Sequence, residues 1–389
     1  MDMNSATSQF KNRFGYSPAR IVRAPGRINL LGEHVDYNDG LVLPAAIDRA
    51  TYIAFSPSVT DRSTIVAVDF DQPAVFSVEG LSAKSQTDGS PLPEWAHYPT
   101  GLMWALREAG LATPAMDAVF LSNVPRGSGL SSSASVEMAF ALAWQTLGGW
   151  TRSPMERALL GQKAENQYVG VNCGIMDQFA SACGEENKAL LLDCRSLEYR
   201  SLPLPESVSL VVADTTVRRK LTSGEYNNRR NACEETVNLL KDDLPGITSL
   251  RDVHLDDFNK LAKGLPPELA RRSRHVVEEI GRVNQSQSLL EAGDVQQFGQ
   301  LMNQCHVSLR DLYEVSIPEL DAMVEIAQGL RGCYGARLTG AGFGGCTINL
   351  VEREHASEFV ERLAKGYESN TGLHPEIYIC RASDGARLL

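Results

Sequence analysis

Four segments of this 389-residue chain concentrate glycines, hydroxyl groups and charged side chains at a density that suits ligand binding. The segment Pro125–Ser135 reads PRGSGLSSSAS, follows a strand-like run and opens a helix that Gly148–Gly149 ends. Glycines let the backbone approach an anion, and the free N–H groups and dipole of a helix N-terminus favour negative charge. The segment therefore suits phosphate, and it equally suits a turn whose serines cap the helix. We call it the phosphate loop.

The phosphate loop departs from the best-known nucleotide-binding motifs. It has no Gly-Lys-Ser/Thr, so it is not a Walker A loop, and it lacks the third glycine of the dinucleotide-binding fingerprint. The catalytic-loop and Asp-Phe-Gly motifs of protein kinases are also absent from the sequence. If this loop binds phosphate, it does so in a different way from these classes.

Ala24–Gly40, here called the sugar segment, reads APGRINLLGEHVDYNDG and is too rich in glycine for a regular helix. It places carboxylates, an imidazole and amide donors together, as recognition of a polyhydroxylated ligand requires, because each hydroxyl both donates and accepts. A solvated turn region has a similar composition. The sequence of this segment alone leaves both interpretations open.

A glycine-rich segment near the C-terminus and an acid-bearing segment in the middle complete the set. Leu338–Cys346, the C-terminal glycine loop, reads LTGAGFGGC, which allows close approach to a ligand or to another loop, although a hairpin or a series of bulges also needs glycines. Within Ala164–Phe179, Glu165 is expected near a helix end and Asp177 lies among apolar and neutral residues. Such an acid also serves as a helix cap or in an ion pair.

In this order and spacing, the four segments resemble the galactokinase branch of the GHMP kinases, named after galactokinase, homoserine kinase, mevalonate kinase and phosphomevalonate kinase. The phosphate loop and the C-terminal glycine loop resemble motifs of the whole superfamily, whereas G-R-x-N-L-x-G-E-H-x-D-Y resembles the galactokinase signature. Arg126 and Ser128 stand where relatives more often have small residues. The resemblance extends over nearly the whole chain.

The resemblance implies a role for each site residue. Asp177 and Arg27 are the expected catalytic residues, flanking the anomeric hydroxyl of the sugar, and Ser133 with Glu165 is expected to hold Mg²⁺. The expected sugar contacts are Glu33, His34, Val35, Asp36, Gly174 and Tyr226. The expected contacts with the ATP phosphates are Gly127, Ser128, Gly129, Leu130, Ser131, Ser132 and Ser133.

The resemblance also implies a fold and a reaction. The expected fold is α+β and two-lobed, with an N-terminal lobe like ribosomal protein S5 domain 2 over residues 1–205 and a ferredoxin-like C-terminal lobe over residues 206–389. The expected reaction moves the γ-phosphate of ATP, the co-substrate, to the C1 hydroxyl of galactose. The alternatives are a non-catalytic sensor of galactose and ATP, and a kinase for a related sugar such as N-acetylgalactosamine. Whether Asp177 acts as a general base or as an electrostatic anchor stays open.

Alternating strand-like and helical runs are expected to position these segments, which also indicates an α+β or α/β architecture. The predicted strands are Thr51–Phe55, Ser63–Val68, Ala118–Leu121, Ala189–Asp193 and Ser209–Asp214. The predicted helices are His97–Glu108, Ser132–Leu147, Arg157–Val169, Tyr226–Leu240 and Pro318–Gln328.

The amino-acid composition disfavours several classes of binding partner. A net charge of -11 disfavours binding that neutralises nucleic-acid phosphates. The eight cysteines are scattered without zinc-site spacing and are expected to be reduced thiols. Met1–Phe10 lacks the features of a secretory signal, and no apolar run reaches the roughly 20 residues of a membrane helix. We expect a cytoplasmic protein that binds small molecules, with no nucleic-acid, membrane or obligate protein partner.

Overall fold

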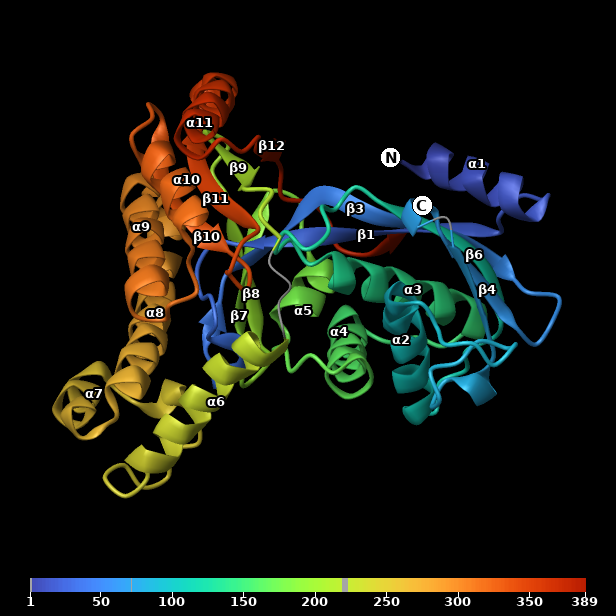
Figure 1. The fold of residues 1–389 in the computed structure, drawn as a ribbon, viewed down its shortest axis with the longest axis horizontal. Helices are drawn as coiled ribbons and strands as arrows, with labels where there is room; N and C mark the ends of the chain where they lie inside the picture. The colour runs from blue at the N-terminus through green and yellow to red at the C-terminus, as the bar shows by residue number, and fades with distance from the viewer. Residues whose placement is uncertain (1, 71, 219–222) are drawn as a thin grey trace.

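The computed structural model describes residues 2–70, 72–218 and 223–389, which form two lobes joined along one side (Figure 1). In the N-terminal lobe a six-stranded sheet has the order β13-β1-β3-β6-β4-β5. Its pairings are antiparallel except between β4 and β6. The strands are β1 (Arg20–Asn29), β3 (Pro44–Pro57), β4 (Ser63–Ala67), β5 (Gln72–Phe76), β6 (Met116–Ser122) and β13 (Arg387–Leu388).

Helices cover both faces of this sheet (Figure 1). The helix α1 (Met3–Phe14) packs Ala6 and Phe10 against Ala54, Val119 and Leu121 on one face. The opposite face carries α2 (His97–Glu108), α3 (Ser132–Gly148), α4 (Pro154–Ala164) and α5 (Met176–Cys183). Because α3 lies between the sheet and its neighbouring helices, its residues are apolar on nearly every side.

The C-terminal lobe contains an antiparallel sheet of order β10-β11-β9-β12. Its central strand β9 is buried at every position, which explains its nearly continuous apolar sequence. The strands are β9 (Val208–Asp214), β10 (Cys333–Thr339), β11 (Cys346–Glu352) and β12 (Glu376–Cys380). The helices are α6 (Ser223–Leu240), α7 (Leu255–Leu261), α8 (Pro267–Ala292), α9 (Val295–Asp311), α10 (Pro318–Gln328) and α11 (Ala356–Thr371).

Two features tie the lobes together. A small sheet of β2 (Leu41–Val42), β7 (Lys188–Asp193) and β8 (Tyr199–Pro203) contacts α8. After β12 the chain returns to the N-terminal lobe, where Leu388 pairs with Val22 of β1. The lobe boundary between residues 205 and 206, which falls between β8 and β9, stays a prediction.

Most predicted elements agree with the observed ones. The helices predicted over His97–Glu108 and Pro318–Gln328 are α2 and α10, because their apolar residues keep a helical period and a proline marks the start of the second. The helix predicted over Arg157–Val169 differs: α4 begins at Pro154, where Ser153 and Glu156 form a capping box, and Glu165–Val169 is a π-helix. No described helix combines the length and hydrophobicity needed to span a bilayer.

Candidate active site

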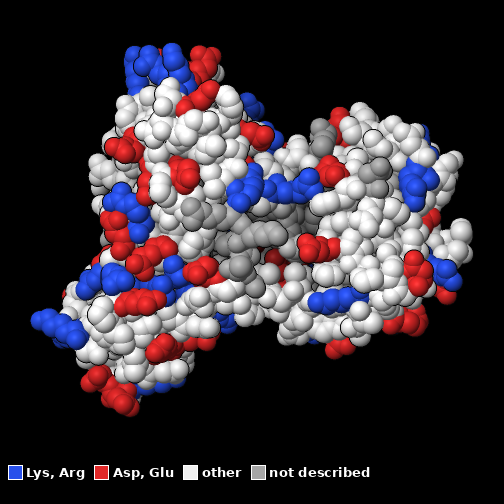
Figure 2. Space-filling view, in the orientation of Figure 1, with Lys and Arg blue, Asp and Glu red and all other residues white. Residues whose placement is uncertain are grey.

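A cavity of about 390 Å³ lies where the two lobes meet. In the space-filling view, basic side chains gather at this junction, on a surface where both charge signs are otherwise interspersed (Figure 2). All four segments singled out from the sequence contribute to its wall, although they lie far apart in the chain. The residues lining it are Arg27, Glu33, His34, Asp36, Tyr98, Gly127, Gly129, Leu130, Ser131, Ser132, Ser133, Glu165, Val171, Cys173, Gly174, Met176, Asp177, Tyr226, Gly340 and Ala341.

The predicted residues Val35 and Ser128 do not line this cavity. Val35 is buried and packs against Gly40, and the hydroxyl of the buried Ser128 donates to the carbonyl of Pro125 at 2.8 Å. Their contacts with sugar and ATP stay predictions. Every other predicted site residue lies in the wall.

The phosphate loop directs the N-terminus of α3 at the cavity. Gly127 and Gly129 have positive φ angles of 63° and 82°, which glycine adopts without strain. Ser131 stands at the N-cap with a φ of 57°, yet its side chain makes no capping hydrogen bond. It donates instead to Asp177 Oδ2 at 2.5 Å. The alternative that the serines serve only as helix caps therefore does not hold for Ser131.

The C-terminal glycine loop packs directly on the phosphate loop. A Cβ atom added to Gly129 would lie 2.8 Å from the carbonyl oxygen of Thr339, and one added to Gly340 would lie 2.8 Å from the Cα of Gly129. Close approach to another loop, one of the roles considered for these glycines, is therefore observed, and their approach to a ligand stays a prediction. Gly340 and Ala341 also reach the cavity wall, so this contact aligns the two loops on the same space.

Arg27 and Asp177 form the polar centre of the site. Arg27 lies at a bulge in β1, is buried, and donates from Nε and Nη2 to Asp177 Oδ1 at 2.8 and 2.6 Å. Its Nη1 donates to the carbonyl of Gly129 in the phosphate loop. Asp177 lies in the first turn of α5, where the helix dipole favours a negative charge, and 27% of its side chain is exposed. Both of its oxygens are thus held in place while the group stays accessible.

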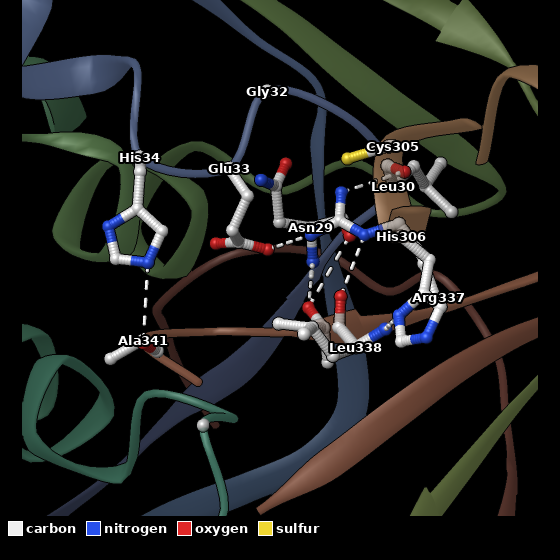
Figure 3. Close-up of polar contacts among 12 residues, drawn as sticks. Asn29, Leu30, Gly32, Glu33, His34, Cys305, His306, Arg337, Leu338 and Ala341 are labelled. Carbon is white, nitrogen blue, oxygen red and sulfur yellow. Dashed lines mark hydrogen bonds and ion pairs between the residues drawn. The ribbon is translucent and has the colours of Figure 1, made fainter. Parts of the chain in front are cut away.

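Glu33 is supported by a residue that the sequence analysis did not single out. The fully buried Arg337 of β10 donates from Nη2 to Glu33 Oε2, and from Nε and Nη1 to the carbonyls of Leu338 (2.7 Å) and Leu30 (3.2 Å) (Figure 3). Burial raises the pKa of Glu33, and the charges of Arg337 and Arg27 oppose that rise. The sequence signal that could have identified Arg337 is a single arginine in an apolar strand just before the C-terminal glycine loop.

Two further sugar-segment residues, His34 and Asp36, pack against Tyr226 and Gly174 in the cavity wall. Burial lowers the pKa of His34 to about 3, so its imidazole is neutral at physiological pH. Burial and then the charge of Asp177 raise the pKa of Asp36 to about 7. The chain passes so close to Asp36 at Gly174 that an added Cβ would lie 2.0 Å from Asp36 Oδ2. Glu33 and His34 are buried and Asp36 is half-buried, which excludes the solvated-turn interpretation of the segment.

Gly174→Ala is expected to raise the KM for the sugar about tenfold or more and to change the KM for ATP little, because the new methyl group must displace the Asp36 carboxylate. Steady-state kinetics with each substrate varied in turn measures both constants. Gly281→Ala is the matched control, because nothing lies within 4 Å of its added Cβ. An unchanged sugar KM in Gly174→Ala would show that Asp36 does not depend on this contact.

Glu165 and Ser133 face each other where a cation could lie between oxygen donors. Burial and the charge of Asp177 raise the pKa of Glu165 to about 7, and hydrogen bonds from Gln178, Cys173 and Ser133 oppose that rise. Gln178 Nε2 lies 2.6 Å from Glu165 Oε2 and 2.9 Å from Oε2 of the buried Glu137. Glu137 and Gln178 were missed because a buried acid and amide in apolar helices leave no pattern of their own.

Several further residues near the cavity were not predicted. Arg218 lies beside Gly127, donates to Asp214 through both Nη atoms and to the carbonyl of Arg126 through Nε, and brings a cation to the phosphate loop. Neutral residues of the wall that the sequence analysis assigned no role are Tyr98, Val171, Cys173 and Met176. Their types are common in any core, so only the fold identifies them.

Comparisons with known proteins agree with this arrangement. A family model described as the galactokinase galactose-binding signature matches residues 8–57, and models of the GHMP kinase N-terminal and C-terminal domains match residues 97–185 and 286–369. The galactokinase of Roseiflexus sp. (strain RS-1) is 47% identical over 99% of this chain and 97% of its own. The galactokinase of Chloroflexus aggregans (strain MD-66 / DSM 9485) is 44% identical over the same shares.

Solved structures lead to the same family. The crystal structure of Lactococcus lactis galactokinase complexed with galactose has a TM-score of 0.93 and 34% identity, with 98% of each chain covered. The mevalonate kinase of Methanococcus jannaschii shares the fold at a TM-score of 0.63 and 19% identity, covering 94% of this chain and 98% of its own. The α+β, two-lobed GHMP kinase fold predicted from the resemblance is thereby confirmed. The chain belongs to the galactokinase family of the GHMP kinases.

Proposed function

We propose that the protein is an ATP-dependent sugar kinase that transfers the γ-phosphate of ATP to the C1 hydroxyl of galactose, giving galactose 1-phosphate and ADP. The observation that carries this proposal is the accessible Asp177, held by Arg27 and Ser131 between the sugar segment and the phosphate loop. A carboxylate fixed there can reach a sugar hydroxyl that faces a terminal phosphate. The match to the galactokinase galactose-binding signature supports galactose as the acceptor.

Phosphoryl transfer depends mainly on positioning and charge stabilisation, and the residues of the cavity divide this work. The backbone N–H groups of the phosphate loop and the N-terminus of α3 bind the phosphates and the charge that grows on the leaving diphosphate. Asp177 orients the C1 hydroxyl and takes its proton as the oxygen bonds to the γ-phosphorus. Arg27 keeps Asp177 in place and stabilises negative charge on the transferring group.

The sugar lies on the other side of this centre. Glu33 and Asp36 accept hydrogen bonds from its hydroxyls, and His34, Gly174 and Tyr226 complete the wall. A carboxylate substrate such as mevalonate fits this set poorly, because it would face the two acidic side chains Glu33 and Asp36. These polar groups of the cavity wall therefore favour a neutral polyhydroxylated substrate.

Ser133 and Glu165 are the residues that would hold Mg²⁺. They fit a hard cation because the Ser133 hydroxyl and the Glu165 carboxyl share one side of the cavity, and a bound cation would favour the ionised form of Glu165, whose pKa burial and the charge of Asp177 raise to about 7. When bound, Mg²⁺ would neutralise charge on the β and γ phosphate oxygens. Location in the cytoplasm and the absence of nucleic-acid, membrane and obligate protein partners stay predictions.

An assay of ADP release with Mg-ATP and a panel of hexoses tests the proposal. We expect turnover with galactose and a product whose ³¹P and ¹³C NMR spectra place the phosphate at C1. Binding of galactose without ADP release would instead indicate the sensor, and preferred turnover of N-acetylgalactosamine would indicate the related kinase. A product phosphorylated at C6 would overturn the roles given to Asp177 and Arg27.

Galactose binding is expected to strengthen as the pH rises through about 7, because the free protein holds Asp36 protonated below that value. A sugar hydroxyl that donates to Asp36 favours its carboxylate, so binding lowers the pKa of Asp36 and releases a proton. Calorimetric titration of galactose in two buffers of different ionisation enthalpy measures that release. In Asp36→Asn the release should disappear; a variant that still releases the proton would assign it to another group.

A further inference from the structure

Two polar residues of α8, His275 and Glu279, have no role in the function proposed so far. The side chains of both are fully buried. They are four residues apart, and Val283 follows at the same interval, so the three side chains lie on one face of the helix. Buried polar groups destabilise a protein unless they find hydrogen-bond partners, so the partners of this pair indicate what the pair does.

Those partners are backbone groups of the sugar segment. Gly32 donates its N–H to Glu279 Oε1 at 2.7 Å, and the carbonyl oxygen of Glu33 lies 3.1 Å from His275 Nε2. A backbone carbonyl can only accept a hydrogen bond, so His275 Nε2 is the donor in the second contact. The two contacts therefore enclose the pair Gly32–Glu33, one at its first backbone nitrogen and one at its last carbonyl.

The sugar segment needs partners from outside because residues 32 and 33 belong to no strand or helix. Backbone N–H and C=O groups that are buried outside regular structure must be paired by side chains or by other loops. The chain turns at Gly32, whose φ angle is 89° (Figure 3). A Cβ atom added to Gly32 would lie 3.2 Å from Val283 Cγ2, so the turn rests directly on this face of α8.

Both side chains of the pair are held by further contacts. Glu279 accepts from Arg282 Nε at 2.6 Å and from Cys305 Sγ at 3.0 Å, and Ser308 Oγ lies 2.8 Å from His275 Nδ1. Burial by itself would raise the pKa of Glu279, but nearby charges, with Arg282 as the strongest, lower it to about 2. The acid is therefore ionised, and the hydrogen bond that it accepts from the sugar segment is charge-assisted.

We propose that His275 and Glu279 are positioning residues that hold the carboxylate of Glu33 in the sugar cavity by fixing its backbone. The inference rests on the proposed function for the contact between Glu33 and galactose. A loop that is ordered before the sugar arrives loses less conformational entropy on binding, so these contacts should strengthen galactose affinity.

The support of Glu33 is thus divided between two elements of the C-terminal lobe. Arg337 of β10 pairs with the carboxylate, whereas α8 holds the backbone that carries it. Neither His275 nor Glu279 lines the cavity. Galactose affinity should therefore depend on how α8 packs against the sugar segment, and not only on the residues that touch the sugar.

Amide hydrogen exchange at Gly32, followed by NMR without galactose, tests the backbone contact directly. Glu279→Leu combined with Arg282→Met removes the acceptor and leaves no unpaired buried charge behind. We expect Gly32 to exchange about tenfold faster in this double variant than in the wild-type protein. Arg282→Met alone keeps the acceptor and should leave the exchange slow. Equally slow exchange in the double variant would overturn the inference, whatever the substrate of the protein.

His275→Phe tests the consequence for binding, because it keeps a ring and removes the donor to the Glu33 carbonyl. We expect the KM for galactose to rise about tenfold, while kcat at saturating galactose and the KM for ATP stay near wild type. His275→Gln can donate from nearly the same place as Nε2 and should restore most of the galactose affinity. A role in packing alone would predict no such rescue, because glutamine does not replace the ring.

Ser273→Ala is the matched control on the same helix. The buried hydroxyl of Ser273 donates to Thr236 Oγ1 of α6 at 2.8 Å, so the variant loses a buried hydrogen bond of α8 but should keep the galactose KM and the exchange at Gly32. A wild-type galactose KM in His275→Phe, or an equal rise in Ser273→Ala, would overturn the inference. Fast exchange at Gly32 in the double variant of a protein that does not turn over galactose would refute the proposed function and support the backbone role.

Discussion

Asp177→Asn is expected to lower kcat about a thousandfold, because an amide cannot take the proton of the C1 hydroxyl and general-base catalysis contributes about 10²- to 10⁴-fold. The KM for galactose should change much less, since the proposed sugar contacts of Glu33, His34 and Asp36 are kept. Steady-state ADP release and the thermal midpoint, measured on the same preparation, separate lost chemistry from lost folding.

Companion variants define what Asp177 does. Arg27→Gln should lower kcat more than it lowers galactose affinity, because Arg27 holds Asp177 and, in the proposed mechanism, stabilises charge on the transferring group. Ser131→Ala removes one donor to Asp177 and should have a smaller effect than either. A folded Asp177→Asn protein with wild-type turnover would exclude the base role and leave Asp177 at most a structural partner of Arg27.

Arg337→Met is expected to lower the free energy of unfolding by about 3–5 kcal/mol, because it leaves the buried Glu33 without its countercharge. Without that arginine, burial raises the pKa of Glu33 further and favours its protonated form, so galactose affinity should fall as well. Chemical denaturation measures the stability, and galactose titration of the folded fraction measures the affinity.

A double variant separates the charge effect from the loss of packing. Glu33→Gln together with Arg337→Met should recover much of the lost stability, because neither position then holds an unpaired buried charge, but should not recover galactose binding. Arg362→Met is the surface control: its partner Glu358 is exposed, so the cost should be about 0–1 kcal/mol. Equal losses in Arg337→Met and Arg362→Met would contradict the support assigned to Arg337.

The sequence could predict elements and segments wherever the signal is local. A helical period and a proline were enough for α10, and glycines with serines marked the phosphate loop because anion binding needs free backbone donors. The resemblance then placed the segments around one ligand. The segments line one cavity because β1 ends, and α3 and α5 begin, at the same edge of the N-terminal lobe.

Residues that act through another side chain escaped prediction, because their partners are distant in the chain. Arg337 and Glu33 are joined only by the packing of β10 against the sugar segment, and Gln178 meets Glu137 only when α5 lies on α3. The directions of the serine side chains could not be predicted either. Nothing in a run of serines indicates that Ser131 donates to Asp177 while Ser128 donates to the carbonyl of Pro125. The π-helix at Glu165 has no sequence signal of comparable strength.

The pairing of β13 with β1 has a consequence for how the protein is made. It joins Val22 to Leu388, and contacts at such sequence separation close late, because a long loop loses conformational entropy before the contact forms. On the ribosome, the edge of β1 at Val22 and Arg23 therefore stays unpaired until β13 is synthesised. Until residue 388 has emerged, the nascent N-terminal lobe therefore presents a short unpaired strand edge, the kind of surface on which chains pair wrongly.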